Sequence, residues 1–186
     1  WFRDNGRHWI PWKLKKDGSI PKPGESLSPY EIWIAEVMLQ QTQLKVVIPY
    51  WENWMKIFPS LSDLVEADLH NIYLIWQGLG YYSRAKRIHQ SSKLLIEYVG
   101  KHRDQDPYSW PVRIDQWMIL PGIGRTTAGS IISSAFDLPT PILDGNVKRV
   151  FSRLFATERK SSKQEKKFWE LSSLLISKLS PRDFNQ

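Results

Sequence analysis

Glu36 is a carboxylate in a sequence context that suits acid–base chemistry. A helix is expected to begin at Ser28, where Ser-Pro-Tyr-Glu forms a capping box with Pro at the first helical position, and to run to about Gln40. Its residues are apolar on nearly every side, so the helix should be buried and Glu36 partly desolvated. Burial raises the pKa of a carboxyl group, so Glu36 could act as an acid near neutral pH. A buried Glu that pairs with an Arg or caps a backbone group would give the same pattern, and the helix alone does not separate these two interpretations.

Asp144 is the second carboxylate of interest, because it opens the string DGNVKR. The string places a carboxylate, the amide of Asn146 and two cations at the start of one helix. As an N-cap alone, Asp144 would have an ordinary structural role. Cleavage of a glycosidic bond, however, needs an acid for the leaving group and an anion near an oxocarbenium-like sugar. Glu36 and Asp144 could supply that pair from distant parts of the chain.

A glycine-rich hairpin is predicted over Leu120–Ser130, LPGIGRTTAGS. The apolar residues before it indicate the end of one helix, and Arg125 and Thr126 open the next. Gly122 and Gly124 are expected to permit positive φ angles. The N–H groups of such a hairpin, together with the N-terminus of the second helix, can bind one phosphate. An ordinary corner between two helices, with glycines for packing, is the alternative.

Two further turns carry side chains that could enter a DNA duplex. Gln41 lies in the string QQTQ after the helix of Glu36, and its amide could bond to base edges. Tyr81 lies in the string GLGYYSR and could be a planar wedge beside an extruded nucleotide. A polar loop and aromatic packing at a helix start are the alternative interpretations.

The elements that must position these residues are predicted to be helices, and the class is all-α. No strand-like alternation longer than a few residues and no internal repeat occurs. Lys13–Leu27 is expected to be a flexible surface loop and 104–111 another loop, 136–142 an extended segment, and 157–167 charged and mobile. Helices are expected over residues 43–58, from 62 or 63, over 68–78, 81–99, about 144–155 and about 164–179.

Composition limits the partners and the metal chemistry. The 186-residue chain has a formal net charge of +7 and an isoelectric point near 9.6, which favours a polyanionic partner. The absence of Cys excludes disulfides and Cys-ligated metals within the chain, and the four His are too scattered for metal-ligand spacing. No signal pattern and no run of about 18 apolar residues occurs. The chain starts at Trp1 and shows no closing signal at Gln186, so a fragment is expected.

Four strings, in this order, together resemble one enzyme family: EVMLQQTQ, GLGYYSRAK, LPGIGRTTAG and PILDGNVKRV. They are similar to the MutY-type adenine DNA glycosylases, which belong to the helix-hairpin-helix superfamily together with endonuclease III. The resemblance covers nearly the whole chain. It implies two α-helical lobes with DNA in the cleft between them, a six-helix barrel over residues 27–134 and a second lobe formed by 1–26 and 135–186.

The resemblance implies removal of adenine that is mispaired with guanine or 8-oxoguanine. Glu36 matches the acid that protonates the leaving adenine and then activates water. Asp144 matches the carboxylate that stabilises the sugar cation, and Asn146 matches its neighbouring amide. The implied DNA contacts are the wedge residues Gln41 and Tyr81, the adenine-pocket residues Trp12, Lys13 and Leu39, and the phosphate-binding residues Gly122, Gly124 and Arg125.

Thr126 occupies the position that separates two classes of the superfamily. Bifunctional relatives such as endonuclease III carry a Lys there, which forms a Schiff base and cuts the strand. Thr126 therefore implies a monofunctional glycosylase. A non-catalytic helix-hairpin-helix DNA-binding module and a thymine-mismatch glycosylase on the same fold are the alternatives. Intact Glu36 and Asp144 argue against the first, and the string EVMLQQT favours adenine over thymine.

The resemblance also implies features outside this chain. The family usually carries four Cys for a [4Fe–4S] cluster and a C-terminal domain that reads 8-oxoguanine, both beyond Gln186. No cofactor is expected within the chain, and a cluster only if the natural protein continues as in the family. The expected partner is double-stranded DNA with a mispaired adenine. The protein is expected to be a monomer and not to bind a membrane. An intracellular location is expected, in the cytoplasm or nucleoid of a bacterium or in the nucleus or an organelle of a eukaryote.

Overall fold

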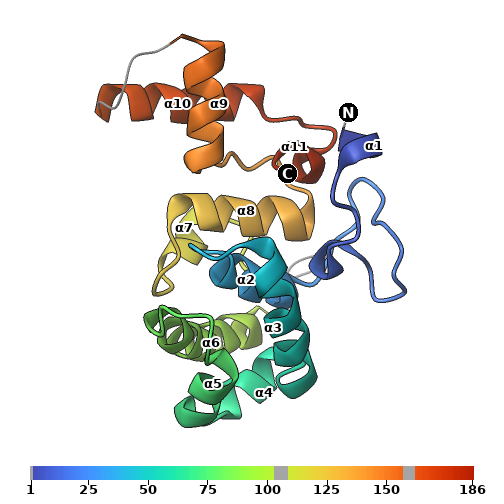
Figure 1. The fold of residues 1–186 in the computed structure, drawn as a ribbon, viewed down its shortest axis with the longest axis vertical. Coiled ribbons are helices and arrows are strands. Elements are labelled where there is room, and N and C mark those ends of the chain that lie inside the picture. Colours follow the sequence, from blue (N-terminus) through green and yellow to red (C-terminus); the bar gives the residue numbers. More distant parts are fainter. Residues whose placement is uncertain (1, 103–108, 157–161) are drawn as a thin grey trace.

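The structure, a computed structural model, describes residues 2–102, 109–156 and 162–186, and the regular secondary structure in these ranges is helical (Figure 1). Within the described residues it contains helices, turns and irregular segments but no strand, which confirms the all-α class. The helices are α1 Phe2–Asn5, the 3₁₀-helix η1 Pro11–Lys13, α2 Pro29–Met38, α3 Leu44–Ile57, α4 Leu61–Glu66, α5 Leu69–Trp76, α6 Ser83–Lys101, α7 Ile114–Met118, α8 Arg125–Phe136, α9 Gly145–Leu154, α10 Ser162–Leu175 and α11 Pro181–Phe184.

Helix α2, which carries Glu36, lies in the interior of the fold. The Ser28 hydroxyl caps the N-terminus of α2 by accepting a hydrogen bond from the N–H of Glu31 at 3.3 Å, as the sequence predicts. The residues on either side of Glu36 are buried, and α2 packs mainly against α8 and α3. The predicted buried helix is therefore confirmed, and the Glu36 carboxyl is held on a rigid element.

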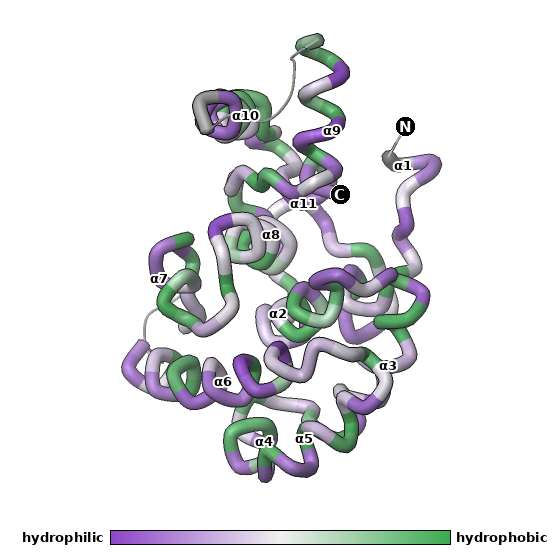
Figure 2. The backbone as a smooth tube through the Cα atoms, turned by 60° about the vertical axis from the view of Figure 1, so that its left-hand side comes forward, coloured by the Kyte–Doolittle hydropathy of each residue, from purple (hydrophilic) through white to green (hydrophobic). Residues whose placement is uncertain are grey.

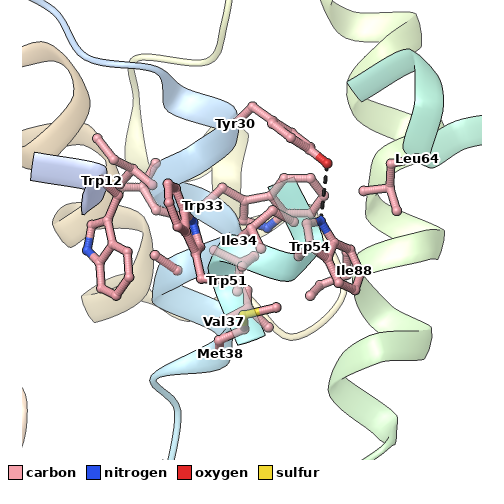
Figure 3. Packing of buried hydrophobic residues seen from close by; sticks show 14 of the residues in the cluster. Trp12, Tyr30, Trp33, Ile34, Val37, Met38, Trp51, Trp54, Leu64 and Ile88 are labelled. Atoms are coloured by element: carbon pink, nitrogen blue, oxygen red, sulfur yellow. Dashed lines mark hydrogen bonds between the residues drawn. The ribbon is translucent and has the colours of Figure 1, made fainter. Parts of the chain in front are cut away.

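Aromatic side chains fix α2 against its neighbours (Figure 3). The Trp54 indole donates to the Tyr30 hydroxyl at 3.2 Å, and this hydroxyl donates to the Phe58 carbonyl at 2.7 Å. The rings of Trp54 and Trp76 pack edge to face, with their centroids 5.8 Å apart. These contacts join α2, α3 and α5, so that Glu36 cannot move independently of the core.

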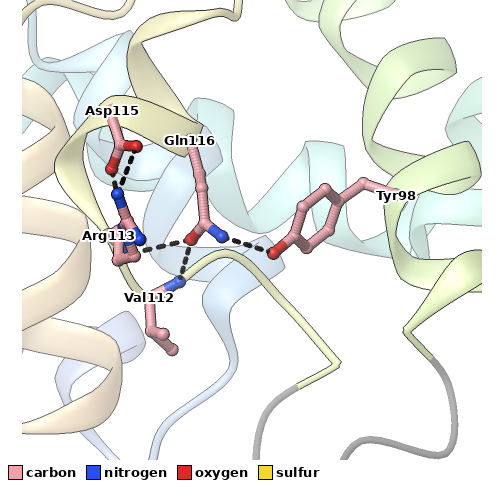
Figure 4. Close-up of polar contacts among 5 residues, drawn as sticks. All are labelled: Tyr98, Val112, Arg113, Asp115 and Gln116. Atoms are coloured by element: carbon pink, nitrogen blue, oxygen red, sulfur yellow. Dashed lines mark hydrogen bonds and ion pairs between the residues drawn. The ribbon is translucent and has the colours of Figure 1, made fainter.

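Helix α7 leads into the glycine-rich hairpin, and Gln116 anchors its first turn (Figure 4). The Gln116 side-chain oxygen accepts from the backbone N–H groups of Val112 and Arg113, at 3.1 and 3.0 Å. Its amide donates to the Tyr98 hydroxyl of α6 at 2.8 Å. Because these bonds tie the start of α7 to α6, the hairpin after α7 has a defined position over the core.

A second, smaller apolar cluster joins α9 to α10. Its buried members are Leu143, Phe151 and Phe168. Figures 1 and 2 both place α9 and α10 on the side of α8 that faces away from α2. The division into two lobes stays a prediction. Ile10 and Trp12, which it assigns to the second lobe, pack in the larger cluster around α2.

Asp137 connects both ends of the chain to the end of α8. One of its carboxylate oxygens accepts from the N–H of Gly24 at 2.8 Å, and the other from the N–H of Arg182 at 2.9 Å. The Arg182 side chain, only 5% exposed, donates to the carbonyl of Glu25 at 2.6 Å. Lys13 belongs to η1, and the rest of the predicted Lys13–Leu27 loop is non-helical, but these bonds fasten its C-terminal part to the core.

The predicted boundaries of α6 are wrong by two residues at each end. The prediction started the helix at Tyr81 and ended it before Gly100, whereas α6 covers Ser83–Lys101. Tyr81 has a φ of 50°, which no right-handed helix contains, so the helix begins only after the turn. Gly100 is tolerated near the end of α6, where a glycine costs only about 1 kcal/mol relative to Ala.

The C-terminal predictions are also partly wrong. The last helix was expected over about 164–179, overlapping the charged mobile stretch 157–167, whereas α10 begins two residues earlier, at Ser162, and ends at Leu175. Residues 157–161 of that stretch, and 104–108 of the predicted loop, lie outside the described residues. Helix α4 begins at Leu61, slightly earlier than predicted, because Ser60 and Asp63 form a reciprocal capping box.

Candidate active site

A cavity of about 420 Å³ brings most of the predicted site residues together. It lies between α2, α8, the start of α9 and segments from both ends of the chain. Seven residues singled out from the sequence line it, namely Trp12, Lys13, Glu36, Leu39, Thr126, Asp144 and Asn146. Gln41, Tyr81, Gly122, Gly124 and Arg125 are not among its lining residues.

Glu36 is one of the titratable groups that line this cavity. Burial raises the pKa of Glu36 from its ordinary value of 4.5 to about 7, and the negative charge of Asp144 acts in the same direction. A hydrogen bond from the Ser130 hydroxyl and the charge of Lys13 oppose this rise. Near neutral pH, Glu36 is therefore present both as an acid that can give a proton and as a carboxylate that can accept one.

Lys13 faces Glu36 within the same cavity. Burial lowers the pKa of Lys13 from 10.5 to about 8, and the positive charge of Arg7 lowers it further, whereas Glu36 and Asp183 act to raise it. Beside it, Trp12 is only 4% exposed and packs against the ring of Trp51 at 5.3 Å. The cavity therefore has an apolar wall and a cation that titrates close to the physiological range.

Asp144 is held by backbone and side-chain bonds at the start of α9. One carboxylate oxygen accepts from the N–H of Val147 at 2.7 Å, which is the predicted N-cap interaction. The other accepts from the Asn146 amide at 3.3 Å, and the Asn146 oxygen accepts from Arg149 at 2.6 Å. The structural and chemical interpretations of Asp144 are thus compatible, since one carboxylate caps the helix and also lines the cavity.

The segment before Asp144 is fastened to α8 and α10. The Thr126 hydroxyl donates to the Leu143 carbonyl at 3.1 Å, and the Ser172 hydroxyl donates to the Ile142 carbonyl at 2.7 Å. A Cβ on Gly129 would lie 2.5 Å from the Pro141 carbonyl oxygen, so only glycine allows this close approach. Through its hydrogen bond to Leu143, Thr126 also helps to hold this segment in place, in addition to marking the position at which bifunctional relatives carry a Lys.

The predicted wedge residues lie on the surface, outside the cavity. Gln41 follows the C-terminus of α2 and has a φ of 59°, and Tyr81 precedes α6 and has a φ of 50°. The Tyr81 side chain is 61% exposed. Left-handed backbone is uncommon for residues with a Cβ and costs free energy, most of all for a bulky one such as Tyr.

The glycine-rich hairpin differs from the prediction in one respect. Gly122 has a φ of 82° as expected, but Gly124 has a φ of −93° and is the N-cap of α8, a conformation open to any residue. The Arg125 guanidinium lies 3.9 Å above the Trp169 ring of α10. Arg125 thus packs on α10 as well as standing at the start of α8.

The sequence interpretation missed several residues that line the cavity. Ser130 and Ser134 are two of them; they follow Thr126 at intervals of four and therefore share its face of α8, a periodic pattern that could have identified that face. Arg7 and Arg182 also line the cavity. No local pattern marks these two, because they reach the site from opposite ends of the chain.

Metal chemistry receives no support from the described residues. No group of three or more His, Asp or Glu among them is placed to hold a metal ion. The chain does not fit an iron–sulfur cluster either, because it contains no Cys to supply thiolate ligands. Among the described helices, none has the length and apolar character needed to cross a membrane.

Comparison with known proteins agrees with this geometry. A model of the HhH-GPD superfamily of base excision DNA repair proteins matches residues 34–173. Adenine DNA glycosylases from Buchnera aphidicola (subspecies Baizongia pistaciae), Rattus norvegicus and Homo sapiens are 38%, 37% and 36% identical to this chain over its whole length. The chain spans about a third to a half of these relatives, 48%, 34% and 33% of their respective lengths.

Solved structures show the same fold at lower identity. A thermostable thymine-DNA glycosylase superposes with a TM-score of 0.80 at 22% identity, over 99% of this chain and 77% of that one. Endonuclease III in a non-covalent DNA complex superposes with a TM-score of 0.67 at 24% identity, over 85% of this chain and 69% of that one. Because the family model matches most of this chain and the relatives align with all of it, this chain belongs to the HhH-GPD superfamily of base excision DNA repair proteins.

Proposed function

We propose that this chain is the catalytic part of a monofunctional adenine DNA glycosylase. Its substrate is adenine mispaired with guanine or 8-oxoguanine in double-stranded DNA, and its reaction is hydrolysis of the N-glycosidic bond. The observation that carries the proposal is the convergence of Glu36, with a pKa of about 7, and Asp144 on one cavity. The choice of adenine as the excised base rests on the names of the relatives, since those quoted above are adenine DNA glycosylases.

The reaction requires the adenine to leave the stack and enter the cavity. A volume of about 420 Å³ lies in the usual range for small-molecule sites, roughly 300–1,000 Å³. Trp12 and Leu39 would contact the faces of the extruded base, as in other enzymes that read a flipped nucleotide between apolar side chains. Lys13 and Arg7 supply hydrogen-bond donors at its polar edge.

The proton transfers are assigned to Glu36. In its protonated form it gives a proton to a ring nitrogen of adenine, and the electron pair of the C1′–N9 bond leaves with the base. The sugar becomes an oxocarbenium ion, which the Asp144 carboxylate stabilises from the start of α9. The ionised Glu36 then takes a proton from water, whose oxygen adds to C1′ and leaves an abasic site.

The DNA itself is bound by the hairpin and the basic surface. The N–H groups at Gly122 and Gly124, together with the N-terminus of α8, point to a phosphate group, and Arg125 adds a cation. Gln41 and Tyr81 are the side chains that wedge into the stack where the adenine departs. The proposal also includes that the protein acts inside the cell as a monomer.

A single-turnover glycosylase assay tests the proposal on duplexes with adenine opposite 8-oxoguanine, adenine opposite guanine, and thymine opposite guanine. Glu36→Gln should lose adenine release by about 10²–10⁴-fold or more while largely keeping its binding to the mismatched duplex. Glu31→Gln is the matched control, because it removes another carboxylate from α2 that does not line the cavity. Excision of thymine instead of adenine would transfer the assignment to a thymine-mismatch enzyme, and DNA binding without base release would identify a non-catalytic module.

The product distinguishes a monofunctional enzyme from a lyase. Since Thr126 has no amine with which to form a Schiff base, the strand should stay intact until alkali or heat cleaves the abasic site. Borohydride should therefore trap little covalent complex, with endonuclease III as the positive control. Efficient trapping would show that another amine attacks C1′, and Lys13 would be the first to examine.

A further inference from the structure

Arg84 is a buried cation that the reaction described above does not use. It lies in the first turn of α6 and is only 4% exposed. Its two terminal nitrogens donate to six oxygen atoms at 2.5 to 3.2 Å, those of the Val37, Met38, Gln40, Leu79 and Gly80 carbonyls and of the Thr42 hydroxyl. An Arg buried with this many acceptors is restricted to one orientation.

The six acceptors belong to two segments that are distant in sequence. One segment is the C-terminus of α2 with the turn that follows it, and the other is the turn before α6. Gln41 stands between two of the bonded residues, Gln40 and Thr42. Tyr81 directly follows the bonded Gly80, and the Arg84 guanidinium lies 5.5 Å from the Tyr81 ring centroid. Arg84 is therefore the common partner of the turns that carry Gln41 and Tyr81.

Both of these turns hold a residue in left-handed backbone. Gln41 and Tyr81 have φ angles of 59° and 50°, and their side chains are exposed. Such conformations persist only where the surrounding structure imposes them. The bonds of Arg84 to the neighbouring carbonyls supply that restraint, and the Trp76 indole adds a bond to the Gly80 carbonyl at 2.9 Å.

We propose that Arg84 is a positioning residue that joins the turns of Gln41 and Tyr81 into one rigid wedge, which enters the DNA stack when the target adenine is extruded. The inference rests on the proposed function for the identity of the substrate. It adds that the two side chains act as a unit, because one guanidinium sets the backbone of both. Loss of the planar Arg84 guanidinium, with its several N–H donors, should then impair base extrusion rather than the proton transfers at Glu36.

The extrusion step can be measured without the chemical step. A duplex carries 2-aminopurine next to an adenine opposite 8-oxoguanine, and the protein carries Glu36→Gln so that the base is retained. Saturating protein should raise the fluorescence as the wedge unstacks the probe. Adding Arg84→Lys should reduce this rise by about half or more, because Lys supplies one point charge in place of a fork. Arg87→Lys, one turn later and exposed, is the matched control and should leave the rise unchanged.

A rate comparison tests whether Arg84 acts through the wedge. In the otherwise unchanged protein, Arg84→Lys should slow single-turnover excision on the order of tenfold or more, since small misplacements near a substrate are costly. In a protein that already carries Gln41→Ala and Tyr81→Ala, the same substitution should cause little further loss. If Arg84→Lys does not fold, Thr42→Val removes one of the contacts and should shift both measurements less, in the same direction.

The outcomes separate the two proposals. An undiminished fluorescence rise in Arg84→Lys, or an equal loss of rate with and without the wedge side chains, would overturn the inference and leave Arg84 as a stabiliser of the core. Failure of the chain with native Glu36 to release adenine would overturn the proposed function, while the fluorescence experiment would still report on the wedge.

Discussion

Glu36 shows at the scale of one residue how a catalytic group opposes stability. The folded protein holds its pKa at about 7, whereas an exposed Glu titrates near 4.5. Below pH 4.5 the group is protonated in both the folded and the unfolded state, so it has no effect. Above this pH the unfolded state releases the proton first, and the folded state is destabilised increasingly until its own carboxyl ionises near pH 7.

The Glu36→Gln variant should therefore be more stable than the unsubstituted protein at pH 8, by at most about 3 kcal/mol, and equally stable near pH 4. Gln has nearly the same shape and never ionises. Urea unfolding followed by tryptophan fluorescence at the two pH values measures the difference. A stability gain of the same size at both pH values would mean that the ionisation of Glu36 does not contribute to it.

The same ionisation predicts the pH dependence of excision. Because protonated Glu36 is the acid, the single-turnover rate should fall above about pH 7, by about tenfold per pH unit once the acid form is scarce. Ser130→Ala removes a hydrogen bond that favours the ionised form, so it should raise the pKa of Glu36 and move this decline to higher pH. Ser134→Ala, one turn further along α8, is the control. A decline that stays in place, or moves to lower pH, would exclude the Ser130 bond from tuning the acid.

Much of this chemistry could be predicted from single residues, and the exceptions have a physical reason. The isolation of Glu36 on an apolar helix is a local pattern, so its burial and raised pKa could be foreseen. Lys13 was expected in the pocket only through the family resemblance. Arg7 and Arg182 were not foreseen, since their contribution depends on where the chain ends meet in space.

At the scale of elements, Asp144 joins the start of α9 to the cavity. Asp144→Asn should preserve the helix, because Asn caps as well as Asp, and should change the free energy of unfolding by less than about 1 kcal/mol. It should nevertheless slow excision on the order of 10²-fold, since the oxocarbenium ion loses its neighbouring negative charge. Thermal unfolding and single-turnover rates measure the two effects separately.

Asp144→Ala is the companion variant, because it removes the cap together with the charge. It should lose stability as well as rate. An Asn variant that excises adenine at the full rate would reduce Asp144 to its structural role at the helix start.

The helix starts at Ser28, Asp68 and Asp144 were predicted better than helix ends or turns. Ser28, Asp68 and Asp144 each cap a helix as their side chains suggest, because an N-cap is a contact between near neighbours. Tyr81 was expected as the first residue of a helix, and its left-handed backbone depends on Arg84 and on contacts across the fold. Gly124 was expected at positive φ, but only Gly122 in that hairpin requires it.

At the scale of the whole molecule, a net charge of +7 predicts a steep salt dependence of DNA binding. Arg125→Ala should lower the magnitude of the slope of log K against log[salt] by about one. The stack of Arg125 on Trp169 adds a second effect, because the Ala variant also loses packing between α8 and α10. Arg125→Met keeps an apolar side chain over the ring, so it should change the slope equally with a smaller loss of stability.

Titration of both variants at several salt concentrations, together with their unfolding curves, separates charge from packing. Slopes identical to that of the unsubstituted protein would indicate that Arg125 contacts no phosphate and serves only to hold α10.

The cavity takes residues from both ends of the chain, and this has a consequence during protein synthesis. Arg7 leaves the ribosome before any residue of α2 to α10, whereas Arg182 and Asn185 emerge only after all of these helices have been made. Domains fold as their residues emerge, so the core around α2 and α8 can form while the wall of the cavity is still missing. A nascent chain would thus display the hairpin and the wedge before it encloses a base. The order of translation itself would delay base release, and an unfinished molecule could bind DNA without leaving abasic sites in it.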